Sequence, residues 1–254
     1  MKIRVRCFNC RDATDKNQAL EEYEIPIQEI QKYELQCNYE HSTTILLRQA
    51  KFELLYEIAA HAIADGYYRE AVTSFAASLE RFYEFFIRTY LRENKTTEEV
   101  ISKLWSDMAS QSERQRGAFT MAYALSTNDE PAVLRSVKFR NDVTHKGEIP
   151  TRENAIKFGQ EVAEIISSTI KKMKEVFPES WWIEYMCQNK DISKFMKDEN
   201  THQESIASML DPQTQEIGKQ TPSLESWVNE ILESKESRRY EEQRELCDSC
   251  RGSH

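Results

Sequence analysis

The chain has 254 residues and a formal net charge of −9, with 39% hydrophobic and 30% charged residues. Only six glycines and six prolines occur, which disfavours a turn-rich β-sandwich or barrel, and the glycines are too scattered for a phosphate-binding or dinucleotide-binding loop. No apolar run approaches the ~18 residues of a membrane span and residues 1–6 lack the apolar stretch of a signal peptide, so we expect a cytoplasmic protein with reduced thiols and no membrane partner.

The first 42 residues differ in pattern from the rest and predict a small β-containing module. Residues 2–7 alternate weakly between apolar and polar side chains. Residues 22–27 and 32–37 are short runs with Tyr, Ile and Leu, bounded by polar residues and a proline. Such runs are typical of short strands.

Two close pairs of metal-ligand residues lie in this module. Cys7 and Cys10 are separated by two residues, and Cys37 and His41 by three. Zinc prefers four sulfur or nitrogen ligands in a tetrahedron, and close pairs on tight turns supply them. We therefore predict a zinc-ribbon-like module at residues 1–42 with a structural zinc ion, because four protein ligands leave no open position.

Two other interpretations of the cysteines stay open. Cys247 and Cys250 form a second closely spaced pair, which could join Cys7 and Cys10 and tie the two ends of the chain together. We rank this second, because Cys37 and His41 are nearer in sequence and close a smaller loop. In the third interpretation the thiols are reduced and bind no metal.

Residues 43–176 show helical periodicity and predict an all-α bundle with short connections. Ser42 and Thr43 have the character of helix caps. The strongest stripe of apolar residues at helical spacing runs from Tyr68 to Tyr90. Expected helices span residues 44–65, 67–93, 98–109, 113–125, 131–141 and 151–176.

Residues 177–250 predict a helical, acidic extension. Trp181 and Trp182 are expected to pack back on the bundle, residues 211–222 are a polar linker, and residues 223–246 begin as an amphipathic helix and become highly charged. Residues 198–254 hold 13 acidic and 6 basic residues, so the rest of the chain carries only −2. The extension would be solvated, cover a basic site or bind a partner. Residues 251–254 resemble the remnant of a purification tag.

Polar and basic side chains concentrate in residues 139–147, where a predicted helix ends. Arg140 lies in the expected last turn and His145 at or beyond the helix end, while Asn141 is four residues from His145 and could orient its imidazole. Arg135 and Lys138 add positive charge. Taken alone, the segment has the basic residues that a helix dipole favours at its C-terminus.

An α-bundle that carries Arg, then Asn, then His five residues after the Arg resembles the HEPN superfamily. The segment from Phe139 to Gly147 and the helix after it are similar to the Arg-Asn…His segment of HEPN ribonucleases. The aromatic helix from Gly66 to Leu91, with Glu80 and Glu84, resembles the long core helix of the family. The resemblance covers about residues 43–176.

The resemblance implies a metal-independent endoribonuclease, in which two copies of the chain pair and their motifs form one cleft. His145 would be a general acid or base, Arg140 would bind the scissile phosphate, and Asn141 would orient the His or contact RNA. Cleavage would leave 2′,3′-cyclic phosphates. Glu80 would reach the cleft, Glu84 would be solvated, and three basic residues would bind RNA: Arg135, Lys138 and Lys146.

Partners and control follow from the same resemblance. RNA, including a compact substrate such as tRNA, is the expected partner, together with a second copy and an antitoxin or other defence-system protein. Some family members are controlled by nucleotide addition to a Tyr two residues after the motif His, and Gly147 occupies that position here. The alternatives are a non-catalytic HEPN module that binds RNA, a nucleotide or a partner, and a structural scaffold without a ligand.

Overall fold

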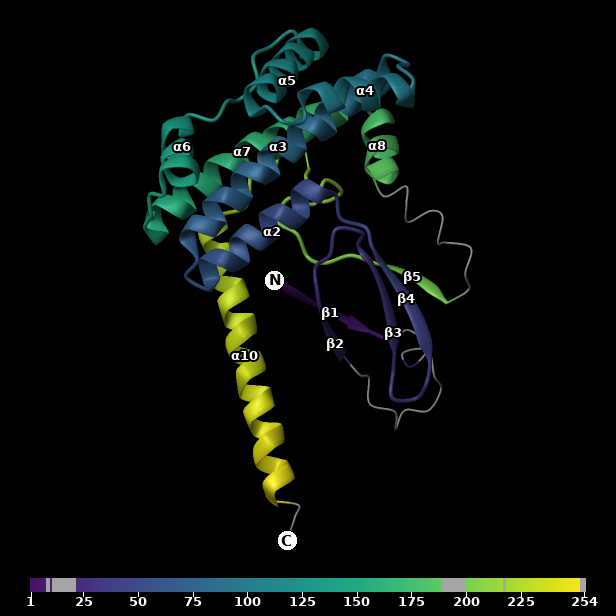
Figure 1. The fold of residues 1–254 in the computed structure, drawn as a ribbon, viewed down its shortest axis with the longest axis vertical. Helices are drawn as coiled ribbons and strands as arrows, with labels where there is room; N and C mark the ends of the chain where they lie inside the picture. Colours follow the sequence, from purple (N-terminus) through teal and green to yellow (C-terminus); the bar gives the residue numbers. More distant parts are fainter. Residues whose placement is uncertain (8–9, 11–21, 189–199, 217, 252–254) are drawn as a thin grey trace.

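The computed structural model of the chain describes the backbone of residues 1–7, 10, 22–188, 200–216 and 218–251, and the side chains of these residues except 22, 239 and 241–251. This part of the chain is mostly helical, with two small β-sheets that come largely from the N-terminal residues (Figure 1). The predicted class, mainly α with a small N-terminal β part, is confirmed at this level.

The two sheets contain strands from both ends of the chain. Strands β1 (Lys2–Arg6) and β2 (Glu22–Pro26) pair antiparallel. Strand β3 (Lys32–Gln36) pairs antiparallel with β4 (Ser42–Leu47), and β5 (Thr201–Glu204) adds to the other edge of β4 in parallel. The three strands expected from the sequence are therefore present. A small apolar core fills the space between the sheets, formed chiefly by Ile3, Val5, Tyr33, Ile45 and Leu47.

The helix predicted over residues 44–65 begins later, and its first residues form β4 instead. Ser42 to Leu47 is rich in β-branched residues, which favour strands, and β3 offers a partner of matching length. Helix α2 (Lys51–Ala64) begins after Ala50, whose N–H donates to Glu53 Oε1 at 2.8 Å. The boundary expected at residue 43 thus cuts through a strand.

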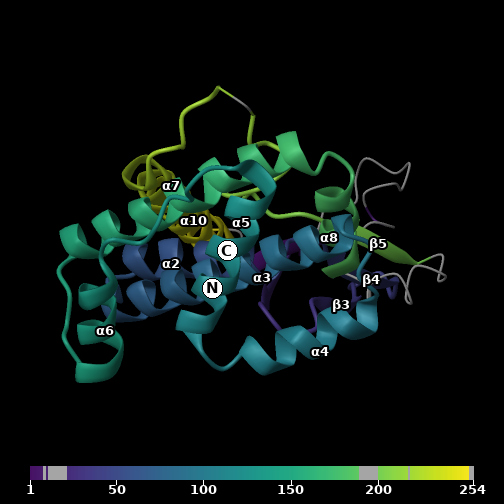
Figure 2. The ribbon, with the colours of Figure 1, turned by 90° about the horizontal axis from the view of Figure 1, so that it is seen from above.

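Helix α3 (Tyr68–Glu93) is the centre of the bundle and packs against most other helices. Its predicted apolar stripe is buried from Val72 through Phe86, and Tyr68 and Tyr90 lie at its partly exposed ends. The surrounding helices are α2, α4 (Glu98–Met108), α5 (Ser112–Thr127), α6 (Val137–Lys146), α7 (Arg152–Val176) and α8 (Ser180–Gln188). Figure 2 shows α6 at one end of the bundle, and α4, α8 and strands β4 and β5 toward the other.

Helix α6 does not begin at Pro131 as predicted. It begins at Val137 and extends to Lys146, five residues beyond the expected end. Gly147 ends it in the left-handed conformation, with φ of 76°, and donates its N–H to the carbonyl of Asp142. Only glycine adopts this conformation without strain, so the helix end is encoded by Gly147.

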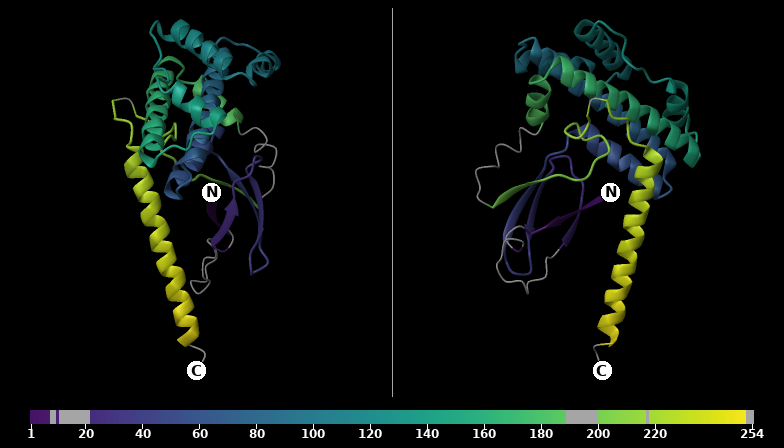
Figure 3. Two further views of the ribbon diagram at one scale, coloured as in Figure 1. Left: turned by 60° about the vertical axis from the view of Figure 1, so that its left-hand side comes forward. Right: turned by 180° about the vertical axis from the view of Figure 1, so that it is seen from behind.

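Helix α10 (Leu224–Arg251) contacts helices α2 and α7 of the bundle. Leu224, Val228 and Ile231 are buried, and the rest of the helix projects away from the bundle, on the side of the bundle where the sheets lie (Figures 1 and 3). Lys235 pairs with Asp65 of α2 at 2.6 Å. The predicted C-terminal extension is thus helical, although β5 ties an earlier part of it to the N-terminal module.

A buried carboxylate on α2 holds two of these C-terminal segments. Glu57 is only 1% exposed. Its Oε1 accepts from the backbone N–H of Met209 at 2.8 Å, and its Oε2 accepts from Trp227 Nε1 of α10 at 2.9 Å. Burial raises the pKa of Glu57 to about 7, although both hydrogen bonds act in the opposite direction.

Candidate functional site

Four metal-ligand side chains converge where β1 and β3 end and β4 begins. We call this group the Cys3His cluster: Cys7, Cys10, Cys37 and His41. Their sulfur and nitrogen atoms all lie within 4.8 Å of one another. Cys10 Sγ is 3.6 Å from Cys37 Sγ and 3.3 Å from His41 Nδ1, and Cys7 Sγ is 3.9 Å from His41 Nδ1.

These separations match the edges of a tetrahedron around one ion. With zinc bonds of about 2.3 Å to sulfur and about 2.0 Å to nitrogen, neighbouring ligand atoms lie about 3.5–3.8 Å apart. The three sulfurs are buried free thiols. Burial, together with the adjacent thiolates of Cys37 and Cys7, raises the pKa of Cys10 to about 12. A bound cation would relieve the repulsion between these thiolates, since its positive charge neutralises several of them at once.

The local backbone explains how the ligands meet. In the turn between β3 and β4, the N–H of Cys37 donates to the carbonyl of His41 at 3.1 Å. The N–H of Glu40 donates to the carbonyl of Cys37 at 2.9 Å, and Glu40 itself has φ of 62°. This tight turn places Cys37 beside His41. The first predicted ligand set is therefore brought together, whereas the side chains of Cys247 and Cys250 lie outside the described residues.

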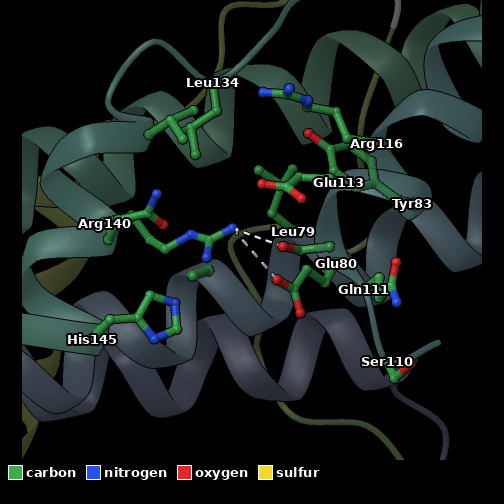
Figure 4. Close-up of a pocket in the computed structure, with 14 residues that line it drawn as sticks. Leu79, Glu80, Tyr83, Ser110, Gln111, Glu113, Arg116, Leu134, Arg140 and His145 are labelled. Carbon is green, nitrogen blue, oxygen red and sulfur yellow. Dashed lines mark hydrogen bonds and ion pairs between the residues drawn. The ribbon is translucent and has the colours of Figure 1, made fainter. Parts of the chain in front are cut away.

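A second group of candidate residues lines a pocket of about 440 Å³ between α3, α5 and α6, which we call the α3–α5–α6 pocket (Figure 4). Glu80 and Tyr83 come from α3, and Ser112, Glu113 and Arg116 come from α5. Helix α6 contributes Arg140, Asn141 and His145. The four residues predicted to be catalytic, including Glu80, therefore share one pocket.

Arg140 is held at the centre of this pocket by two groups. Its Nη2 donates to Ser112 Oγ at 3.2 Å and lies 3.8 Å from Glu80 Oε1. Its side chain is 18% exposed, and its buried Nε has no hydrogen-bond partner. Because a guanidinium has five N–H donors, Arg140 can bind an anion while it keeps these contacts.

His145 lies in the last turn of α6, inside the helix, whereas the sequence placed it at or beyond the helix end. It is exposed at the mouth of the pocket. Asn141 lines the pocket one turn earlier, but no hydrogen bond joins the two side chains, both of which the structure describes. An exposed imidazole at the mouth of a pocket is suited to proton transfer with a bound substrate.

The three basic residues predicted to bind RNA lie outside this pocket. Lys146 pairs with Asp142 at 2.6 Å, one turn earlier on α6. Arg135 and Lys138 are exposed near the start of α6. Glu84, predicted to be solvated, is only 20% exposed and pairs with Arg81 at 2.9 Å, so that expectation was wrong.

Several pocket residues escaped the sequence analysis, among them Tyr83, Ser112 and Glu113. Tyr83 belongs to the apolar stripe of α3 and stacks on Phe119, so its pattern is that of a core residue. Ser112 and Glu113 are ordinary residues for a first helical turn. Only the packing of α5 against α3 brings them to Arg140, and no local signal encodes that contact.

Comparison with protein-family models, curated proteins and solved structures finds no match to the chain. Within the described residues, the longest and most apolar helices fall short of what crossing a membrane requires.

Proposed function

We propose that the chain is a metal-independent endoribonuclease of the HEPN type and that the α3–α5–α6 pocket is its active site. One observation carries the proposal: Arg140, Asn141 and His145 of α6 line one pocket with Glu80, which pairs with Arg140. A fixed guanidinium beside an exposed imidazole is suited to cleaving a phosphodiester.

In the proposed reaction, His145 takes the proton of a ribose 2′-hydroxyl. The 2′-oxygen then attacks the adjacent phosphorus, the bond from phosphorus to the 5′-oxygen breaks, and that oxygen takes a proton. The products are a 2′,3′-cyclic phosphate and a 5′-hydroxyl. Arg140 stabilises the negative charge on the phosphoryl oxygens, and Glu80 and Ser112 position Arg140 through the contacts described above.

A second acid–base group is needed to protonate the leaving oxygen. We propose that it is His145 of a second copy of the chain, so that the active enzyme is a homodimer with RNA, including tRNA, as its substrate. A cytoplasmic nuclease of this kind would act as a toxin or antiphage effector, and an antitoxin or other defence-system partner would restrain it.

One observation favours the alternative, a HEPN module that binds RNA, a nucleotide or a partner without cleavage. Glu80 and Glu113 line the same pocket as Arg140 and Arg116, so the two carboxylates balance the charge of the two guanidinium groups. A neutral pocket attracts a polyanion less strongly than a basic one.

The Cys3His cluster has a separate role in this proposal. We propose that its ion is zinc and that it is structural, because four protein ligands complete the tetrahedral shell. The ion would join the end of β1 to the turn between β3 and β4, where Tyr23 packs against the three cysteines. No step of the cleavage reaction uses it.

The deciding experiment measures cleavage of total RNA and purified tRNA in excess EDTA by the wild-type chain, His145→Ala, Arg140→Ala and the control Arg114→Ala. Arg114 is exposed on α5, outside the pocket. We expect each pocket variant to lose about 100-fold or more in rate and the control to lose less than about twofold. The wild-type products should end in 2′,3′-cyclic phosphate.

Circular dichroism must show that each protein stays folded, since EDTA also removes a structural zinc ion. Wild-type protein that is folded but inert, or a His145→Ala variant as active as wild type, would contradict the nuclease proposal. Binding of the same RNAs without cleavage would support the alternative.

A further inference from the structure

The α5 side of the α3–α5–α6 pocket carries two charged side chains with no described partner. Glu113 and Arg116 both line the pocket, in the first turns of α5. Among the residues whose side chains the structure describes, neither makes an ion pair or a side-chain hydrogen bond. They are three residues apart on one helix face, where opposite charges often pair, yet they do not contact each other within ion-pair distance.

Two other charged side chains in the pocket, Glu80 and Arg140, are paired with each other. Glu80 faces Arg140 at 3.8 Å, and Ser112 Oγ accepts from Arg140 at 3.2 Å. Arg140 and His145 belong to the α6 side, and Glu113 and Arg116 to the α5 side (Figure 4). The pocket therefore has an α6 end and an α5 end. At the α5 end, the carboxylate of Glu113 can accept hydrogen bonds and the guanidinium of Arg116 can donate them to a ligand.

The floor between these ends is apolar. Leu79, Tyr83 and Leu134 are buried and line it. Burial raises the pKa of Tyr83 to about 12, so its ring is a neutral wall at ordinary pH. The volume of about 440 Å³ lies in the about 300–1,000 Å³ range of pockets that hold small ligands. A planar ring could lie on this floor with polar groups at its edges.

A ligand that satisfies the α5 end needs an anionic group for Arg116 and N–H donors for Glu113. A nucleotide has both, because it joins a phosphate to a base with N–H groups on its edge. A simple phosphate would leave the Glu113 carboxylate beside a like charge, and an apolar ligand would leave both charges unpaired.

We propose that the α5 end of the pocket binds the nucleotide next to the scissile phosphate, with Arg116 on the phosphate of that nucleotide and Glu113 on the N–H groups of its base. The substrate is then a single strand, since a paired base would not offer this edge. Guanine is the favoured base, because its N1–H and N2–H₂ groups are adjacent and match both oxygens of one carboxylate. This assignment rests on the proposed ribonuclease function for the role of Arg140 and His145.

The test measures binding rather than cleavage, so that it is separate from the chemistry of His145. Fluorescence anisotropy would follow wild type, Arg116→Ala, Glu113→Gln and the control Arg114→Ala with labelled 2′-O-methyl pentanucleotides, which lack the attacking hydroxyl. The central base would be G, A, C or U between adenosines, and the salt concentration would be varied.

We expect Arg116→Ala to weaken binding of every pentanucleotide at least fivefold. It should also reduce the slope of log K against log salt by about 0.7, the value for one phosphate contact on a single strand. Arg114→Ala should change neither quantity measurably, because it lies outside the pocket. Glu113→Gln should reduce the preference for a central G about tenfold, since only one of the two terminal atoms of the amide can accept a hydrogen bond and the other would face a donor of the base.

Equal binding by Arg116→Ala and Arg114→Ala would overturn the assignment, and so would a wild-type protein that binds none of the four RNAs. An unchanged preference in Glu113→Gln would overturn the base-reading part. If the Arg116 effect is present but wild type does not cleave ordinary RNA, the binding assignment stands and the nuclease proposal fails.

Discussion

At the scale of single residues, Glu57 has the clearest measurable property. Its pKa in the folded protein is about 7, above the ordinary value of 4.5, because the carboxyl group is buried. The folded state therefore holds this proton more tightly than the unfolded state. As the pH rises from about 5 to 8, the Glu57 contribution to the free energy of unfolding should fall by about 3 kcal/mol. Urea unfolding followed by circular dichroism across this range measures the fall.

Glu57→Gln should make this dependence on pH shallower, because glutamine does not titrate. Its free energy of unfolding at low pH should be about 1–3 kcal/mol lower than that of wild type, since the amide leaves one of the two buried donors unpaired. Glu179→Gln is the matched control, because Glu179 is exposed. A Glu57→Gln curve parallel to that of wild type would show that another group causes the dependence.

Residues with local signals were predictable, and residues assembled by packing were not. The spacing of Cys7 and Cys10, and of Cys37 and His41, predicted a group that the structure brings within 4.8 Å. Arg140 and His145 lie on one short helix and share a pocket, but their catalytic roles stay a prediction. Glu57 gave no signal, because the donors that it accepts from are Met209 and Trp227, more than 150 residues away.

At the scale of secondary-structure elements, the contact of α7 with α3 and α10 depends on Gly159. A Cβ at this position would lie 2.5 Å from a side-chain atom of Phe75 on α3 and 2.5 Å from Leu224 at the start of α10. The carbonyl of Gly159 also accepts from the Tyr56 hydroxyl at 3.1 Å. We expect Gly159→Ala to lower the free energy of unfolding by about 1–3 kcal/mol through overpacking.

Gly117→Ala is the natural control, because Gly117 lies within α5 and a Cβ there has no neighbour within 4 Å. This variant should be about 0.5–1 kcal/mol more stable than wild type, since alanine favours a helix more than glycine. Chemical denaturation of both variants measures the difference. If Gly159→Ala gained as much stability as Gly117→Ala, the close packing of Leu224 on α7 would not limit stability.

Two elements show when a local sequence pattern is enough to predict the secondary structure and when it is not. The stripe on α3 is long enough that only a buried helix fits it. The segment from Ser42 to Leu47 is short and only its last three residues are apolar, and such a run fits a strand or a helix equally well. The segment forms a strand because it pairs with β3 and with the distant β5. The residues of these two partners lie outside the segment, so its own sequence does not predict the strand.

At the scale of the whole molecule, the strands beside the Cys3His cluster lie apart from helices α5 and α6, which line the α3–α5–α6 pocket (Figures 1 and 2). We expect one zinc ion per chain by metal analysis of the native protein, and its loss in Cys37→Ser. Without the ion, hydrogen exchange should rise at least about tenfold in β1 to β4 and in β5, while the buried turns of α3 remain protected.

Cys187→Ser is the control for this measurement, since Cys187 lies on α8 outside the cluster. It should keep the zinc and the wild-type exchange pattern. A native protein that contains no zinc or other transition metal would contradict the metal prediction. Equal exchange in Cys37→Ser and wild type would contradict a structural role for the ion.

The parallel pairing of β4 with β5 has a consequence for the order of events during synthesis. About 150 residues separate these two strands in the chain. At about 5–20 residues per second, the ribosome needs roughly 10–30 s to make them. During that time α3 and its neighbours can already form, because their contacts are closer in sequence, whereas the edge of β4 is still uncovered. The sheet of β3 and β4 is therefore begun early in synthesis but completed late, and nascent chains should depend on chaperones in this interval.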